Sequence, residues 1–473
     1  DQPSHSRCGA QRALRRLEDE VAKLQAHPPP FLEEISAPSV APLAIDGQGN
    51  LVIPDAREGP WHIDVVVQGE PTDPVYREPL RFRLRFTSGW PRELPEVYVR
   101  GLSQFGALSP ERTPPALFYE VLAERCRGSY LLEEVVRMVR QLLLEPLAAL
   151  GFTERDAEEE GSFAQRVLLV RSAAREIQGQ RLAVIRRYEP LARHPALFGR
   201  DTPLRREWFA PAFWAACESG AALAWQQVLT ELLPGNVYSF QLFSEEFCDM
   251  LVEEVFSFNA SGLPANAPNT MNRYGLALGD VGLEGLCDKL QALLQPLGAA
   301  LFPGAGRGWD GHHCFVVRYR MGEDLGLDMH NDDSDVTFNV CLGLEFTGAG
   351  LQFCGHVGAP DHRHHTITYE HRKGWCVVHV GRQRHGADDI LSGERLNLIL
   401  WNTSSTYRQS RLFNEMSYYR EDGVPDEVCL SYTHDRDFGS FRQYPPGRED
   451  FRGRGWCPPP PAEYEGFRED TAA

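Results

Sequence analysis

The chain alternates between two kinds of hydrophobic spacing. Residues 10–25 place apolar side chains at helical intervals and are followed by three consecutive prolines, which predicts a helix that ends there. Residues 61–69 instead form a strand-like run, and residues 79–86 alternate apolar and Arg side chains, as a strand half-buried in a sheet does. A short strand is expected at 96–99, and residues 129–146 return to the helical period. The first third of the chain is therefore expected to be a mixed α/β domain.

The pattern changes again near residue 237. A short strand is expected there, followed by a helix for which Ser244 is a plausible N-cap. Strand-like runs then recur at 314–320, 336–344, 351–355, 365–370, 374–380 and 395–401. Six such runs separated by turn signals predict an antiparallel barrel or jelly roll.

Two further segments complete the predicted organisation. Residues 153–236 are expected to be a mainly helical linker and docking segment with an acidic front at 154–161. Residues 406–473 are rich in Pro, Gly and charged residues and are expected to form an extended C-terminal tail. The predicted fold class is α+β multidomain.

Composition narrows the partners and the compartment. The 473 residues suggest two to four domains at about 150 residues each. The net charge of −18 argues against a nucleic-acid partner or an anionic membrane surface. The eleven cysteines include no CxxC pair, which favours reduced thiols and a cytoplasmic or nuclear protein. The chain begins at Asp1 rather than Met, so a removed signal peptide is left open.

Residues 328–339, DMHNDDSDVTFN, carry the main candidate chemistry. His330 and Asp332 form an HxD pair just before a strand, and side chains two residues apart in an extended chain point the same way. A second histidine from a distant strand, His385, would complete a two-His, one-carboxylate facial triad, which suits non-haem Fe(II) oxygenases. His379 is the competitor for the third ligand, but only His385 has an arginine at the right offset.

A co-substrate pocket is expected beside this metal site. Arg395 opens the last strand, where its guanidinium could bind the far carboxylate of 2-oxoglutarate through two parallel hydrogen bonds. Asn397 shares a face with Arg395 because side chains two apart in a strand point the same way. Tyr319 ends the strand before the HxD pair and could donate to the same carboxylate, and Asn339 is a further candidate contact.

The remaining polar groups near the HxD pair have simpler interpretations. Asp333 is expected to be a solvated turn residue, and so is Asp335, unless Asp335 holds the loop. A histidine-rich stretch is interpreted as a solvated lid loop, with adventitious metal binding as the alternative. It comprises His356, His362, His364, His365 and His371.

Residues 237–405 resemble the 2-oxoglutarate- and Fe(II)-dependent oxygenases of the prolyl-4-hydroxylase and lysyl-hydroxylase type. Within that group they resemble the family named 2-oxoglutarate and iron-dependent oxygenase domain-containing protein 2. The blocks that carry the resemblance are PNTMNRYG (268–275), FVVRY (315–319), TFNV (337–340), FTGAGLQFCG (346–355) and HGADDILSGERLNLILW (385–401). The resemblance implies a double-stranded β-helix (jelly-roll) core and dependence on Fe(II), 2-oxoglutarate, O₂ and ascorbate. It assigns iron to His330, Asp332 and His385, and 2-oxoglutarate to Arg395 and, more loosely, to Tyr319.

The PNTMN block offers candidates for the substrate-binding rim. Asn269, Thr270, Asn272 and Tyr274 could contact a substrate, or the block could be a purely structural turn, and the sequence favours neither.

Residues 8–152 resemble a different family, the ubiquitin-conjugating (E2) fold. The resemblance rests on the helix followed by three prolines, on GEPTDPVY (69–76) and on WPRELPEV (90–97), which is similar to the family's YPxxPPxV turn. An E2 carries ubiquitin on a cysteine soon after that turn, but residues 98–125 contain none, and Cys126 lacks the surrounding motif. The resemblance therefore implies a non-catalytic E2-like (UBC-like) module.

The function expected from the sequence is a 2-oxoglutarate-dependent dioxygenase that hydroxylates a protein or peptide side chain and releases succinate and CO₂. The alternative is a scaffold that binds ubiquitin or another protein through residues 8–152, with a structural or weakly active oxygenase domain. A combination, in which the E2-like module delivers a protein substrate, is also left open.

Overall fold

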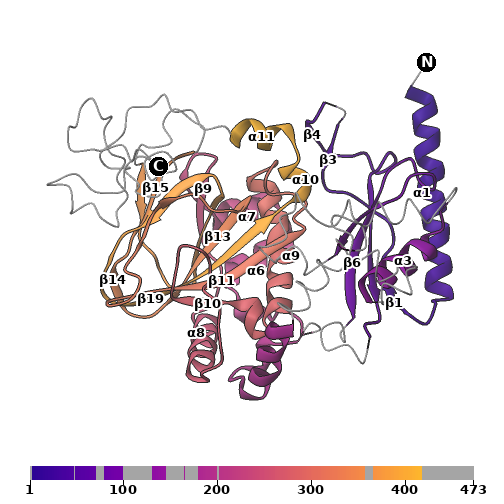
Figure 1. Cartoon of the computed structure of the whole chain (residues 1–473). Helices are drawn as coiled ribbons and strands as arrows, with labels where there is room; N and C mark the ends of the chain where they lie inside the picture. The colour runs from indigo at the N-terminus through magenta and orange to yellow at the C-terminus, as the bar shows by residue number, and fades with distance from the viewer. Residues whose placement is uncertain are drawn as a thin grey trace, which may run out of the picture. The chain divides into compact units, whose positions relative to one another are not determined.

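The computed structural model divides the chain into two compact units, residues 1–183 and 184–473, and each is described by itself (Figure 1). The structure describes residues 3–46, 48–70, 79–99, 130–144, 165, 179–199, 202–356 and 366–417. The division falls within the stretch 153–236 that the sequence suggested as a linker. Residues 184–236 thus belong to the second unit.

The first unit is an antiparallel sheet with helices packed on it. Its elements are α1 (Pro3–Ala26), β1 (Leu32–Ile35), β2 (Ser39–Val40), β3 (Ala44–Ile45), β4 (Leu51–Val52), β5 (Trp61–Val67), β6 (Leu80–Phe86), β7 (Glu96–Val99) and α3 (Leu132–Leu144). The sheet order is β1-β5-β6-β7, β2 also pairs with β5, and β3 and β4 form a separate hairpin. The predicted helices and strands of this region are confirmed.

One hydrophobic core joins these elements. The helical stripe of α1, including Leu17 and Val21, packs with Ile63 of β5, Leu84 of β6 and Val136 of α3, and all five are buried. The order helix, antiparallel sheet, helix is the one that the E2 resemblance implies, although the assignment to that family stays a prediction. The segment that lacks the E2 cysteine, and Cys126 with it, lies outside the described residues.

Two antiparallel sheets form the second unit. The larger sheet comprises β8 (Thr230–Leu233), β9 (Val237–Gln241), β10 (Gly275–Ala277), β11 (Gly311–Arg320), β13 (Val336–Gly343), β14 (Phe346–Gly348), β17 (Trp375–Val380) and β19 (Ile390–Thr403). Its strand order is β10-β11-β19-β13-β17-β9-β8, and β14 also pairs with β19. The smaller, in the order β12-β18-β15-β16, comprises β12 (Leu327–His330), β18 (Gln383–Ala387), β15 (Leu351–His356) and β16 (Ile367–Tyr369). Side chains of both sheets, such as Phe315 and Phe353, meet in one core. This is the predicted jelly-roll architecture.

Helices cover the outer face of the larger sheet, with α8 against β13, and α9 against β11 and β19 (Figure 1). The helices are η2 (Glu189–Leu191), η3 (Pro195–Leu197), η4 (Arg206–Trp208), α6 (Pro211–Ser219), α7 (Ala222–Val228), α8 (Glu245–Ala260), η5 (Leu278–Val281), α9 (Glu284–Leu301), α10 (Ser405–Arg408) and α11 (Arg411–Ser417). Ser244 caps α8 as predicted, since its hydroxyl accepts the backbone N–H of Phe247 at 3.3 Å.

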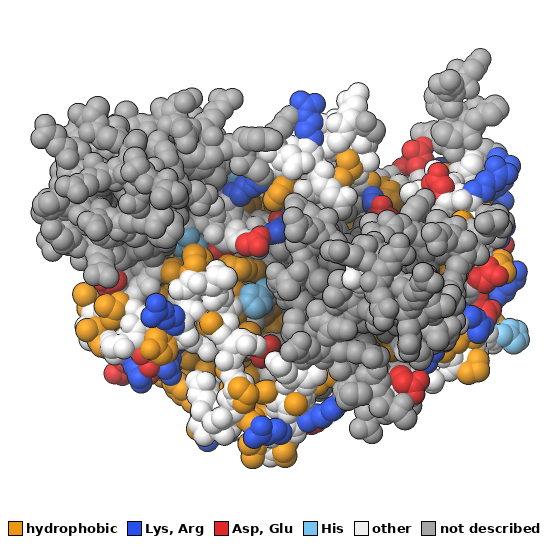
Figure 2. Space-filling model, viewed as in Figure 1, with side chains coloured by type: hydrophobic (Ala, Val, Ile, Leu, Met, Phe, Trp, Pro, Cys, Tyr) orange, Lys and Arg blue, Asp and Glu red, His pale blue; other side chains and the backbone are white. Residues whose placement is uncertain are grey.

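Some details of the second unit differ from expectation. The first residues of the predicted extended tail form α10 and α11, and residues 418–473 lie outside the described residues. Six described cysteines are free, as the expectation of reduced thiols has it, but Cys354 is disulfide-bonded. None of the described helices combines the length and hydropathy required to cross a bilayer. On the face drawn in Figure 2, the described basic and acidic side chains are interspersed.

Candidate metal centre

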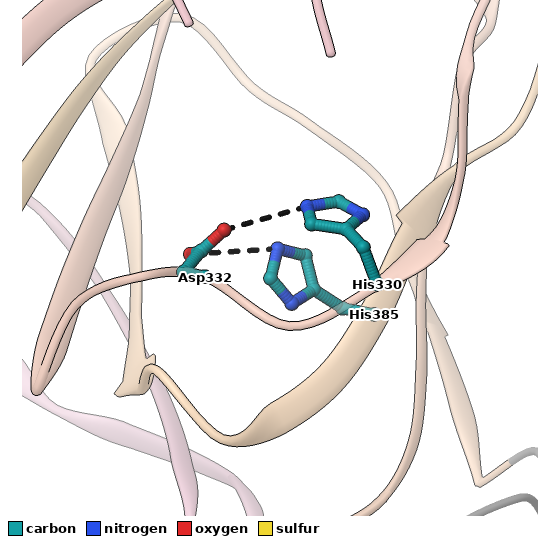
Figure 3. A group of neighbouring side chains, drawn as sticks. All are labelled: His330, Asp332 and His385. Carbon is teal, nitrogen blue, oxygen red and sulfur yellow. Dashed lines mark ion pairs between the residues drawn. The ribbon is translucent and has the colours of Figure 1, made fainter. Parts of the chain in front are cut away.

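The three predicted ligands lie together at the edge of the smaller sheet. His330 is the last residue of β12 and is the cross-strand partner of His385 in β18. Directly opposite residues of an antiparallel pair point to the same face, so the two imidazoles are neighbours. Asp332 follows two residues after His330 and turns its carboxylate toward both rings (Figure 3). One donor atom from each residue lies within 4.8 Å of the other two.

The distances within this cluster suit a shared ion. His330 Nε2 lies 3.4 Å from Asp332 Oδ1, and His385 Nε2 lies 3.7 Å from Asp332 Oδ2. The three side chains are 8%, 4% and 5% exposed for His330, Asp332 and His385. Two imidazoles and one carboxylate that converge in this way match the facial triad of non-haem Fe(II) enzymes.

Neighbouring groups hold two of the ligands in orientation. His385 Nδ1 lies 2.8 Å from the carbonyl of Gln383, which fixes the proton on Nδ1 and leaves Nε2 with a lone pair for a metal. The Thr337 hydroxyl donates to Asp332 Oδ2 at 2.6 Å, and the Asp332 N–H donates to the carbonyl of Gly381 at 2.9 Å. Such contacts from outside the ligand set position ligands and tune their affinity.

The protonation states are those that a metal requires. Burial lowers the pKa of His385 to about 3, so its imidazole is neutral at pH 7. Burial opposes ionisation of Asp332, but the imidazoles of His385, His330 and His379 outweigh it and hold the pKa of that carboxyl well below its usual range. Metal binding needs neutral imidazoles and an ionised carboxylate, so neither of these two ligands has to lose a proton first.

Arg395 lies inside the same barrel. It is only 1% exposed and is the cross-strand partner of Tyr319, whose ring centroid lies 4.6 Å from the guanidinium carbon. It donates to the carbonyl of Ala349, but its Nε has no hydrogen-bond partner and no carboxylate of the described residues forms an ion pair with it. A buried charge without a counter-charge is costly, so this pocket is built for an anionic ligand.

The other candidates for co-substrate binding lie beside Arg395. Asn397 Nδ2 donates to Asn339 Oδ1 at 2.5 Å, and it lies 3.4 Å from Nδ1 of His371. Asn397 Oδ1 is buried and has no hydrogen-bond partner among the described residues. Burial, together with the charge of Arg395, lowers the pKa of His371 well below its usual range. Because His371 is buried, the solvated-lid interpretation is wrong for that residue.

The PNTMN block contains both a structural turn and a link to the pocket. Asn269 Oδ1 accepts the backbone N–H groups of Met271 and Asn272, at 2.8 and 2.6 Å, which makes it a turn residue. Asn272 is 2% exposed and donates through Nδ2 to the Tyr319 hydroxyl at 3.2 Å. Thr270 and Tyr274 are exposed, and a substrate can reach them.

Residues around the metal cluster also include two that the sequence interpretation misjudged. Asp335 is not solvated: its side chain is fully buried, and it accepts the N–H of Ser404 and an ion pair from Arg408. The loop-holding alternative is therefore the correct one. His379, considered only as a rival ligand, lies beside the cluster with its Nε2 at 4.0 Å from Asp332 Oδ2. Asp333 is 83% exposed, as expected of a turn residue. Residues 357–365 lie outside the described residues.

Two facing antiparallel sheets hold a two-His, one-carboxylate cluster and a buried arginine that forms no ion pair with a described carboxylate. This combination defines the class of non-haem iron, 2-oxoglutarate-dependent oxygenases. The model of the OGFOD2-like domain matches residues 184–307. The chain belongs to the family of 2-oxoglutarate and iron-dependent oxygenase domain-containing protein 2. The mouse member is 37% identical over 239 residues, which are 49% of this chain and 68% of that protein.

Other relatives match over smaller shares of their length. Protein CP2 of Arabidopsis thaliana, a 2-oxoglutarate and iron-dependent oxygenase domain-containing protein, is 36% identical over 250 residues, 50% of this chain and 62% of the relative. The chain thus spans less than two thirds of that relative. Human procollagen-lysine,2-oxoglutarate 5-dioxygenase 1 is 30% identical over 161 residues, 32% of this chain and 21% of that protein. A Pseudomonas putida prolyl-4-hydroxylase structure aligns with a TM-score of 0.28 and 16% identity, covering 42% of this chain and 97% of that one, and at this score it supports no argument.

Proposed function

We propose that the protein is an Fe(II)- and 2-oxoglutarate-dependent dioxygenase that hydroxylates a protein or peptide side chain and releases succinate and CO₂. The observation that carries the proposal is Arg395, a buried cation without a carboxylate partner among the described residues, in the same barrel as the facial triad. A facial triad alone fits several metal chemistries, whereas a triad beside an unmatched buried cation calls for an anionic co-substrate.

Each residue of the cavity has a defined task in this proposal. His330, Asp332 and His385 would hold the metal, and three protein ligands would leave coordination positions for other ligands. The bound iron would supply the oxidative chemistry. Arg395 would bind the far carboxylate of 2-oxoglutarate, and the Tyr319 hydroxyl, held by Asn272, could donate to it. Apolar side chains shared by the two sheets surround these residues and would limit the access of water to them.

A protein or peptide substrate is supported by the relatives and by the rim. The name of the human relative states that it acts on lysine in procollagen. In this chain Asp324 Oδ2 accepts the backbone N–H groups of Arg273 and Tyr274, at 2.8 and 3.2 Å, and so fixes the PNTMN loop to the turn that follows β11. A rim of backbone and small polar groups with an exposed tyrosine suits contact with a polypeptide.

The test is formation of succinate from 2-oxoglutarate by the purified full chain with Fe(II). His330→Ala and Asp332→Ala should abolish turnover because each removes a ligand. His194→Ala is the matched control: its imidazole pairs with Glu253 on the surface, so turnover should stay at the wild-type level. Equal turnover by wild type and the two ligand variants would refute the proposal.

We further propose that residues 8–152 form a non-catalytic E2-like module that binds a protein partner such as ubiquitin. The module has its own hydrophobic core, and Ile53, next to the β3–β4 hairpin, leaves 67% of its surface exposed. The test is a titration of isotope-labelled ubiquitin with the full chain, followed by NMR. Line broadening that Ile53→Glu abolishes would support binding, and an unchanged spectrum at excess chain would exclude ubiquitin as the partner.

A further inference from the structure

His379 is a fourth polar side chain that faces the metal cluster. It lies on β17 opposite Thr337 of β13, which itself donates to the metal-binding carboxylate. Its side chain is fully buried, and its ring centroid lies 4.4 Å from that of His385. The ring is bordered on its other side by Phe353, at 5.4 Å between centroids. His379 is thus enclosed between the cluster and the apolar core.

Only one of its two nitrogens has a partner. Nδ1 lies 2.9 Å from the carbonyl of Val380, and a carbonyl can only accept, so the proton resides on Nδ1. Nε2 therefore presents a lone pair. It is buried, has no hydrogen-bond partner among the described residues, and lies 4.0 Å from the acceptor oxygen Oδ2 of Asp332. Two electron-rich atoms that face each other across such a gap need a cation or a hydrogen-bond donor near both.

The geometry favours a donor near His379 over direct coordination. The described ligand set whose donor atoms all lie within 4.8 Å of one another contains His330, Asp332 and His385, but not His379. Asp332 Oδ2 already receives the Thr337 hydroxyl at 2.6 Å. A water molecule at an open position of the metal would carry two hydrogens and would need an acceptor close to the cluster. Among the described groups, Nε2 of His379 is a buried acceptor without a donor.

We propose that His379 is a positioning residue that accepts a hydrogen bond from a water molecule at an open position of the metal. The inference rests on the proposed function, since it requires that the facial triad holds a metal. It explains why a polar ring is kept at a fully buried position of β17, where an apolar side chain would pack at lower cost. With its acceptor Nε2, His379 also favours ligands that donate a hydrogen bond beside the metal cluster.

Metal binding without turnover tests this. Mn(II) is titrated into the full chain without 2-oxoglutarate, and its dissociation constant is measured by electron paramagnetic resonance. His379→Phe keeps a flat ring against Phe353 but removes the acceptor, and should weaken Mn(II) binding by about 10- to 100-fold, the usual effect of losing a group that supports a metal site. His379→Gln restores an acceptor oxygen and should recover part of the affinity.

His312→Phe is the matched control, because His312 is also a buried histidine but pairs with Asp288 of α9. Its Mn(II) affinity should equal that of the wild type, and thermal unfolding verifies that each variant is folded. Equal affinity of wild type and His379→Phe would overturn the inference alone. X-ray absorption on the Co(II) form of the wild type should show two imidazole ligands. Three imidazole ligands would make His379 a metal ligand and would also overturn the inference. A wild type that binds no metal would overturn the proposed function as well.

Discussion

Arg395 and Arg408 of the second unit differ in their partners, and this difference predicts opposite behaviour on substitution. Arg408 forms ion pairs with Asp333 and Asp335, both at 2.9 Å, and the Asp335 side chain is fully buried. Arg395 is 1% exposed and forms no ion pair with any described carboxylate. Methionine removes the charge in either case and keeps a long side chain. Arg395→Met and Arg408→Met are therefore a matched pair.

The magnitudes follow from what each substitution leaves behind. Arg395→Met loses a hydrogen bond from a charged group, worth about 1.5–3 kcal/mol, but it also removes a buried charge whose desolvation costs several kcal/mol. These effects oppose each other, so its free energy of unfolding should stay within about 2 kcal/mol of the wild type. Arg408→Met leaves the buried Asp335 without its counter-charge and should lose about 3–5 kcal/mol.

The stabilisation that the ligand gives should rank the two variants in the opposite order to their losses of stability. 2-Oxoglutarate at 100 times its dissociation constant stabilises a protein by about 2.7 kcal/mol, which for a unit as long as 184–473 raises Tm by about 4–5 °C. The assay is thermal unfolding with Mn(II), without O₂, and with increasing 2-oxoglutarate. Arg395→Met should show no shift, whereas Arg408→Met should unfold earlier but keep the full shift. A full shift in Arg395→Met, or a loss of stability there as large as in Arg408→Met, would refute the reasoning.

Three further outcomes are expected. Thr337→Val removes the hydroxyl that donates to Asp332 and should weaken Mn(II) binding by about 10- to 100-fold in calorimetric titration; unchanged affinity would contradict this. Burial lowers the pKa of His62 from 6.5 to about 3, so the unfolded chain gains a proton there that the folded unit does not. The free energy of unfolding of the first unit should thus fall as the pH drops from about 6.5 to 3. His62→Gln should reduce this fall when the free energy is measured by urea unfolding at each pH. A fall as steep as in the wild type would exclude His62 as its source. Asp324→Ala frees the rim loop and should lower hydroxylation of a polypeptide substrate more than uncoupled succinate formation; equal losses would show that the loop serves the co-substrate side.

The longer strands of the second unit could be predicted because they are runs of apolar and β-branched residues, most of which are buried, as all of β13 is. β12 and β18 could not be predicted in the same way. They have 4 and 5 residues, and in β18 every residue of QRHGA is buried although most are polar or small. Their composition reflects the ligands they present, His330 and His385, so the hydrophobic pattern that identifies other strands is absent there.

Packing at long range explains other differences. Helix α9 contains Pro296 and Gly298, residues that usually end a helix, yet Leu286, Leu290 and Leu294 bury one stripe against the larger sheet and keep the segment helical. The aromatic residues Trp208, Phe209 and Phe213 of the expected linker are buried in the second unit. A sequence shows that such residues are apolar, but it does not show which surface they cover.

The clustering of His330, Asp332 and His385 could be predicted from the sequence, because the HxD pair lies just before a strand signal and His385 and Arg395 stand at characteristic offsets after it. Two properties that give the site its chemical direction could not be identified, because a missing partner is a property of neighbours in space. Among the described residues, Arg395 is a buried positive charge without an ion pair, and His379 Nε2 is a buried lone pair without a donor. The first should attract a carboxylate, and the second a hydrogen-bond donor beside the metal. 2-Oxoglutarate carries carboxylates and a keto oxygen but no hydrogen-bond donor, so it would satisfy Arg395 and not His379. The acceptor of His379 is therefore left for a water molecule, and the two buried groups would select two different ligands.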